Sequence, residues 1–199
     1  DEGPSIEYEV DPRHVKISCR AMGIEEGSKS VNTPGIKQAL KDVDPELDNA
    51  DTAIYRSGTM RINYIAPDRP ELLFAGKECA RRMNTPCRSD MEALKRLARF
   101  LLGMPRVVQI FKHQLEARVR TFTGFSGTDH AGCLRTRKLT SGGALLHGAN
   151  LVKAYASTQS VIGTSSGESE FYGMARMASI LLGARAMAND LGIKTTLKL

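Results

Sequence analysis

Between residues 141 and 157 the chain reads SGGALLHGANLVKAYAS. Two strand patterns, Ser141 to His147 and Leu151 to Ser157, flank Gly148-Ala149-Asn150, a short turn-forming stretch. This pattern predicts two adjacent strands joined by a tight turn. Further strand patterns occur at residues 107–111, 118–126 and 195–199.

A long helix is predicted after these strands. Ser165 and Glu168 form a Ser-x-x-Glu start signal, and Gly192 marks the end of the helix. The predicted apolar stripe consists of Phe171, Met174, Ala175, Ala178, Leu181 and Leu182. If this helix crosses the strands, the second half of the chain is a mixed α+β or α/β domain.

The first half of the chain has a different pattern. Residues 1–52 are polar and rich in turns, with one short helix predicted near residues 12–22. Helical patterns follow at residues 52–66 and 70–83, and a third helix starts at a Ser89/Glu92 capping box and ends at Gly103. The third helix carries Lys95, Arg96 and Arg99 on its polar face.

The net charge of +6 is unevenly distributed. Residues 1–50 carry 6 basic and 11 acidic side chains, residues 51–120 carry 14 and 7, and residues 121–199 carry 8 and 4. The basic middle and end suit a polyanionic partner, because Lys and Arg side chains bound to phosphates release counterions. Arg135, Arg137 and Lys138 are candidate phosphate contacts, and an ordinary solvated turn is the alternative for them.

Two function classes are disfavoured. No apolar run approaches the ~20 residues of a membrane span, and the first residues show no secretory signal pattern. The four cysteines are scattered without metal-ligand spacing, which favours free thiols in a reducing compartment. We therefore expect an intracellular protein, cytoplasmic or nuclear, that is not secreted and has no membrane partner.

Acidic residues are scarce after residue 120, where only Asp129, Glu168, Glu170 and Asp190 occur. Capping of the long helix is sufficient to explain Glu168. Glu170 lies about one turn into that helix and would face the strand end that carries Asp129 if the helix crosses the strands. Converging carboxylates of this kind hold paired Mg²⁺ ions for phosphodiester cleavage.

Several long motifs resemble the Pol polyprotein of copia-type retrotransposons. The segment RINYIAPDRP at 61–70 and the segment KECARRMNTP at 77–86 resemble its reverse transcriptase after the palm. The segments GFSGTDHAGC at 124–133, TRKLTSGG at 136–143 and QSVIGTSSGESEFY at 159–172 resemble its ribonuclease H module, in the same order. The resemblance covers roughly residues 7–199.

The resemblance implies an Asp, Glu, Asp set around Mg²⁺ that cleaves the RNA strand of RNA–DNA hybrids. The Glu position falls on Glu170, and the first Asp position falls on Gly127. Asp129 lies two residues further along the strand, a displacement of about 6.6 Å, and His130 replaces the family's Trp. The third Asp would follow the strand that starts near Thr195, beyond the last residue given.

The resemblance divides the chain into a polar approach at 1–52, a helical thumb- or connection-like region at 53–106, and a ribonuclease H-like domain at 107–199 that is truncated at its carboxyl end. The reverse transcriptase element Tyr-x-Asp-Asp is absent from the sequence, so this chain alone is not expected to synthesise DNA. Two functions remain open: Mg²⁺-dependent hydrolysis of RNA in hybrids, impaired here, and non-catalytic nucleic-acid binding by a remnant of the element. The expected partners are an RNA–DNA hybrid or other nucleic acid and the remainder of the polyprotein.

Overall fold

The computed structural model describes residues 3–25, 27–36, 42–114, 120–129, 136, 138–161 and 163–199. The chain divides into two compact units, one formed by Glu9–Gln109 and the other by Asp1–Tyr8 together with Ile110–Leu199. The α-helices of the described part are α1 (Arg13–Ala21), α2 (Asn49–Ile65), α3 (Leu73–Ala80), α4 (Arg88–Gly103) and α6 (Ser166–Asp190), and the 3-10 helices are η1 (Ala66–Asp68) and η2 (Pro70–Leu72). The strands are β1 (Ser5–Glu9), β2 (Val108–Lys112), β3 (Thr121–Asp129), β4 (Thr140–His147), β5 (Asn150–Thr158) and β6 (Thr196–Lys198).

The helical unit, Glu9–Gln109, is built around one apolar core. Its fully buried members include Tyr55, Ile62, Leu94 and Leu97, which come from α2 and α4. The phenol of buried Tyr55 donates a 2.7 Å hydrogen bond to the carbonyl of Cys79 on α3. Residues of the polar approach enter the same core through α1, since Val15 and Cys19 are buried in it.

Helix α4 begins earlier than its capping-box motif predicts. The residue that precedes its first turn is Cys87, whose backbone N–H donates to the carboxylate of Asp90 at 2.8 Å. Ser89 lies inside the first turn and is hydrogen-bonded to Asp44. The Ser89/Glu92 box is therefore wrong, because the carboxylate of Asp44 already accepts from the Ser89 N–H group that Glu92 would have bonded.

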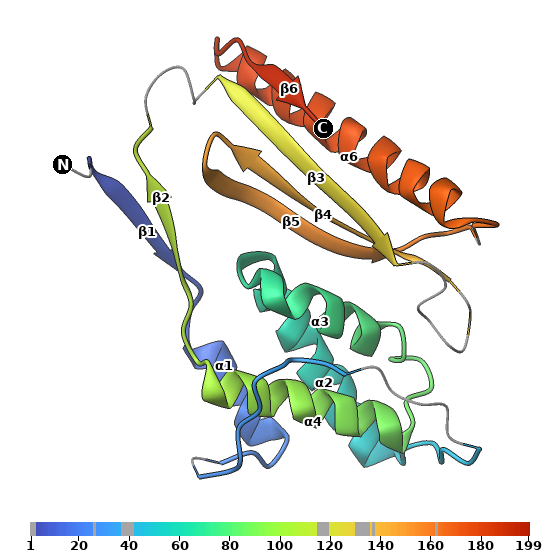
Figure 1. Ribbon diagram of the computed structural model, residues 1–199. Coiled ribbons are helices and arrows are strands. Elements are labelled where there is room, and N and C mark those ends of the chain that lie inside the picture. Colours follow the sequence, from blue (N-terminus) through green and yellow to red (C-terminus); the bar gives the residue numbers. More distant parts are fainter. Residues whose placement is uncertain are drawn as a thin grey trace. The chain divides into compact units, whose positions relative to one another are not determined.

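The strand unit contains a four-stranded sheet in the order β5-β4-β3-β6. Strands β3, β4 and β5 form an antiparallel meander, and β6 pairs parallel with the start of β3. The predicted turn between β4 and β5 is present, with Gly148 at a φ of 59°. Figure 1 shows α6 running along the sheet, with its first residues near the end of β3.

One face of this sheet packs on α6. The helix lies close to the sheet at Gly124, because a Cβ on it would lie 2.6 Å from Cγ of Met177 and 2.9 Å from Cδ1 of Leu181. The apolar core between sheet and helix is small: Phe122, Leu145, Met177, Leu181 and Ala188.

The apolar stripe predicted for α6 is mostly wrong. Of its members, Leu181 is buried, whereas Phe171, Met174 and Leu182 are exposed by 67%, 47% and 50%. Helix α6 carries apolar residues around most of its circumference, so the periodicity alone did not identify the buried face.

Strand β2 forms where a strand was predicted, but it lies outside the four-stranded sheet and pairs with β1 in a separate two-stranded sheet. The described cysteines Cys19, Cys79 and Cys87 are free, as expected, and all three are buried. In the described part of the chain, no helix combines the length and apolarity that a membrane crossing requires.

Candidate functional site

The end of β3 and the first turns of α6 form the candidate site. Ser126 and Thr128 point toward the helix, because a Cβ on Gly173 would lie 2.8 Å from Oγ of Ser126 and 2.7 Å from Cγ2 of Thr128. Since successive side chains of a strand alternate between faces, Gly127 and Asp129 lie on the opposite face of the sheet. A glycine at position 173 lets α6 approach the strand at this point.

Glu170 lies on α6 one turn before Gly173 and reaches the edge of β3. Its Oε1 accepts a hydrogen bond from the backbone N–H of Thr128, at 3.3 Å. Strand β6 pairs with β3 only from Thr121 to Thr123, so the Thr128 amide lies beyond this pairing. The carboxylate of Glu170 therefore satisfies a backbone donor at the end of β3, and the rest of its surface is exposed.

Asp129 is the other acid predicted for the site. It is exposed, and it is paired in register with Thr140 of β4. The structure brings Asp129 and Glu170 to the same end of β3, but Asp129 is on the sheet face that points away from α6. Gly127 lies on that same face, so the face does not distinguish the two positions. Asp129 differs from position 127 by its displacement of about 6.6 Å along the strand.

Gly127 occupies the position of the expected first Asp. A Cβ on Gly127 meets no atom within 4 Å, and its φ is not among the positive values of the described glycines. Nothing in the backbone or the packing requires glycine at this position. The position lacks a carboxylate, yet it has space for one.

Glu168 has the structural role expected of it. The hydroxyl of Ser165 accepts from the Glu168 N–H at 3.1 Å, which caps the start of α6. The Glu168 carboxylate accepts from both the N–H and the hydroxyl of Thr164, each at 2.7 Å. These hydrogen bonds hold the pKa of Glu168 below its usual value.

A buried polar network beneath the start of α6 was not identified from the sequence. The side-chain amide of Gln159 donates to the hydroxyl of Ser141 at 2.8 Å and to the carbonyl of Ser169 at 3.1 Å. All three residues are buried. Gly163 packs against Ser169, because a Cβ on Gly163 would lie 2.7 Å from the Ser169 hydroxyl. These contacts give Gln159, Gly163 and Ser169 structural roles. From the sequence, the segment 159–172 that contains them was recognised only as a motif of the family resemblance.

A second polar contact joins α6 to β5. The guanidinium of Arg176 stacks on the ring of Tyr155, 4.7 Å from its centroid, and donates to the hydroxyl of Ser157 at 2.5 Å. Arg176 thereby has two partners on the sheet. It is a poor candidate for phosphate binding, although it lies on the same helix as Glu170.

The basic residues predicted to contact phosphates have different surroundings. Arg135 and Arg137 lie outside the described residues, and Lys138 is half-buried. On α4, Lys95 and Arg96 are half-buried and Arg99 is exposed. Arg96 donates a 2.7 Å hydrogen bond to the hydroxyl of Thr33, so part of its donor capacity is used within the chain.

Much of the positive charge of the helical unit is already paired. Arg81 bonds Glu78, and Arg82 bonds Asp90. Arg69 is fully buried, where it bonds Glu71 and the carbonyl oxygens of Met104 and Pro105. The segment charge of residues 51–120 therefore overstates the number of cations available to an outside polyanion.

Paired Mg²⁺ ions do not fit the acids of this site. A two-metal centre needs several oxygen ligands that face a common point. Among the described residues, Glu170 reaches the edge of β3, Gly127 supplies no carboxylate, and Asp129 is displaced by about 6.6 Å along the strand from position 127. Within the described ranges, no cluster of three or more His, Cys, Asp or Glu side chains has the arrangement of a metal site.

Two curated proteins of Arabidopsis thaliana are similar to this chain. An uncharacterized mitochondrial protein is 28% identical over 136 residues, which cover 68% of this chain and 55% of that protein. A retrovirus-related Pol polyprotein from transposon RE1 is 25% identical over 146 residues, which cover 73% of this chain and 10% of the polyprotein. The chain thus spans about half of the first relative and a tenth of the second. No family model matches the chain, and no solved structure matches it.

The second of these relatives is named as a retrovirus-related Pol polyprotein from a transposon. The resemblance to copia-type Pol polyproteins that the sequence motifs predicted is thus supported, at modest identity.

Proposed function

We propose that this chain is a Pol-derived nucleic-acid-binding protein with a ribonuclease H-like strand unit, which binds RNA–DNA hybrid without cleaving it. The strand order and the crossing helix support the ribonuclease H-like fold, since three antiparallel strands precede α6 and a fourth strand pairs parallel with the first of them. The observation that carries the proposal is the acid set at the end of β3. Glu170 lies at the end of β3, but Gly127 supplies no carboxylate beside it.

Loss of one acid is sufficient to impair this chemistry. The metal pair activates the attacking water and stabilises the leaving oxygen, and each ion needs its ligands at fixed positions. Asp129 is not a substitute for an acid at position 127, because it is displaced by about 6.6 Å along the strand. Among the described residues, the expected Mg²⁺ pair therefore has no adequate donor set.

Binding to a polyanion requires less exact geometry than catalysis does. Lys95 and Arg99 lie four residues apart on α4, and neither has an ion-pair partner among the described residues. Contacts of this kind with the phosphate backbone weaken with salt, because each one releases counterions. We expect modest affinity that weakens with added salt, since some of the positive charge of the helical unit is already paired.

A second function, Mg²⁺-dependent hydrolysis of the RNA strand, is favoured by one observation. The space at Gly127 is open, and Glu170 already reaches the adjacent amide of Thr128. The architecture of the site is thus compatible with an acid at position 127. Hydrolysis by the present sequence would require Asp129 or another acid to take over that role.

Fluorescence anisotropy of the full chain with a labelled RNA–DNA hybrid tests the binding proposal. We expect binding that weakens steadily with added salt, and a double variant Lys95→Ala/Arg99→Ala with lower affinity and a smaller salt slope. Arg81→Ala is the matched control, because that guanidinium is paired with Glu78. Absence of binding at low salt, or equal loss in both variants, contradicts the proposal.

A further inference from the structure

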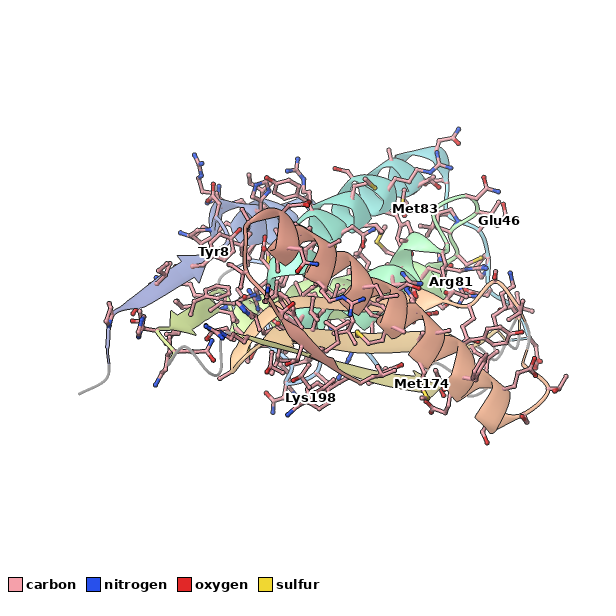
Figure 2. The ribbon with its side chains drawn as sticks, turned by 90° about the horizontal axis from the view of Figure 1, so that it is seen from above. Tyr8, Glu46, Arg81, Met83, Met174 and Lys198 are labelled. Carbon is pink, nitrogen blue, oxygen red and sulfur yellow. The ribbon has the colours of Figure 1, made fainter. Side chains whose placement is uncertain are left out.

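The position of the Glu170 carboxylate depends on how α6 is held on the sheet. Glu170 bonds the Thr128 amide from the first turns of this helix, whereas the apolar core beneath the helix lies further along it, at Met177 and Leu181. Figure 2 shows α6 from above, lying over the strands of the sheet, with Met174 labelled in its first half. The contacts that fix α6 along and around its axis therefore decide where the carboxylate lies.

The side chain of Met177 lies in a gap that two glycines leave on the sheet. A Cβ on Gly124 of β3 would lie 2.6 Å from Cγ of Met177 and 2.8 Å from its Sδ. A Cβ on Gly143 of β4 would lie 2.6 Å from Cε of the same side chain, which is fully buried. Because protein interiors are close-packed, displacement of α6 along β3 would push the Met177 side chain out of this gap.

Glu170 lies on the same side of α6 as Met177. The two residues are seven positions apart, which is about two turns and about 10.5 Å along a helix axis. Gly124 and Thr128 are four positions apart, about 13 Å along a strand, and Gly173 lies over Thr128, so α6 runs antiparallel to β3. A helix with Met177 at Gly124 therefore brings Glu170 close to the Thr128 amide. A shift by one helical turn would move the carboxylate by about 5.4 Å.

Arg176 restrains a different motion, the rotation of α6 about its own axis. At 100° per residue, it lies about 120° around the helix from Glu170. Its guanidinium stacks on the ring of Tyr155 at 4.7 Å and donates to the hydroxyl of Ser157 at 2.5 Å. Both partners lie on β5, which is separated from β3 by β4. Contacts to β3 and to β5 thus hold α6 at two points of its circumference, and the helix cannot roll without breaking one of them.

We propose that Met177 and Arg176 are positioning residues for the carboxylate of Glu170. Met177 sets the place of α6 along β3, and Arg176 sets the rotation of the helix. Both act through contacts inside the strand unit. This positioning requires neither hybrid binding nor Mg²⁺, so its test is independent of the proposed function.

The Thr128 amide proton reports directly on the position of Glu170. In a two-dimensional amide NMR spectrum of the full chain, Glu170→Ala should shift the Thr128 signal, because the amide loses a carboxylate acceptor. We expect Met177→Leu, which keeps the buried volume and should fold, to reduce this Glu170-dependent shift by about half or more. Leu145→Val is the matched control, since Leu145 belongs to the same core and its truncation should leave the shift intact.

Arg176→Met tests the rotational restraint in the same way. Met keeps an aliphatic stem but lacks the guanidinium that binds β5, so the Glu170-dependent shift of Thr128 should again be reduced. Arg185→Met is the control, because Arg185 is an exposed arginine on the same helix. An unchanged shift in either test variant, or an equal reduction in its control, overturns the positioning role of that residue. A Thr128 signal that does not respond to Glu170→Ala in the wild-type chain overturns both.

Discussion

The carboxylate of Glu170 accepts a hydrogen bond from the backbone N–H of Thr128, with 3.3 Å between oxygen and nitrogen. This contact joins the first turns of α6 to the end of β3, at the place where the resemblance to copia-type Pol predicts a catalytic acid. The neighbouring position, Gly127, carries no side chain that could complete a metal site.

The close approach of α6 to β3 depends on Gly173. Gly173→Ala is expected to lower the free energy of unfolding by about 1–3 kcal/mol, because the new Cβ would overlap the Thr128 and Ser126 side chains. Gly183→Ala, on the same helix, is the control: its Cβ meets no atom within 4 Å, so we expect a gain of about 0.5–1 kcal/mol. Urea unfolding followed by circular dichroism measures both, and changes of the same sign would contradict this packing.

The buried amide of Gln159 supports the start of α6. Gln159→Leu is expected to lower the free energy of unfolding by about 1–3 kcal/mol, because the carbonyl of Ser169 and the hydroxyl of Ser141 lose a donor. Ser179→Ala removes a hydroxyl that bonds a carbonyl within the exposed part of α6, and it should change stability by less than about 0.5 kcal/mol. Similar losses for the two variants in urea unfolding would show that the network is not important.

Capping by Glu168 should give stability a dependence on pH. Its hydrogen bonds to Thr164 lower the pKa of the carboxyl in the folded state below the usual value of 4.5. The stabilisation is therefore present above pH 4.5 and is lost as the pH falls through the lower folded-state pKa. The difference in unfolding free energy between wild type and Glu168→Gln should shrink as acid is added below pH 4.5, and a difference that grows there would be inconsistent with this capping.

Restoring an acid at position 127 should create affinity for divalent cations. Gly127→Asp is expected to fold normally, since its Cβ has open space, and to bind Mg²⁺ about tenfold more tightly than wild type. Gly127→Asn, of the same size but uncharged, is the matched control. Isothermal titration calorimetry with MgCl₂ measures the gain, which should disappear when Glu170→Gln is added. Equal binding by the Asp and Asn variants would mean that the two positions do not share a cation.

Local signals in the sequence were sufficient to predict much of the secondary structure of the strand unit. The turn at Gly148 and the cap at Ser165 depend on short-range chemistry, and both lie where they were predicted. The pairing of strands that are distant in the sequence could not be predicted from local signals. The pattern at 107–111 predicted a strand, but nothing in that segment indicated that it pairs with β1.

In the candidate site, too, local features were predicted from the sequence and features that depend on long-range contacts were not. The position of Glu170 beside β3 followed from its spacing in the helix, and the structure places it there. The face on which Asp129 lies depends on which side of β3 packs against α6, and the Gln159 network depends on contacts between residues that are 10 and 18 positions apart. The paired arginines of the helical unit likewise became apparent only from their partners, because a charge count treats every guanidinium alike.

The most direct test of the central claim is cleavage of a labelled RNA–DNA hybrid by the full chain in Mg²⁺, with Glu170→Gln assayed in parallel. We predict that both proteins bind the hybrid and that neither releases RNA fragments above the level of a protein-free sample. RNA cleavage by the wild-type chain that Glu170→Gln abolishes would contradict the account, and would show that the acids of this chain hold a working metal site without a carboxylate at Gly127.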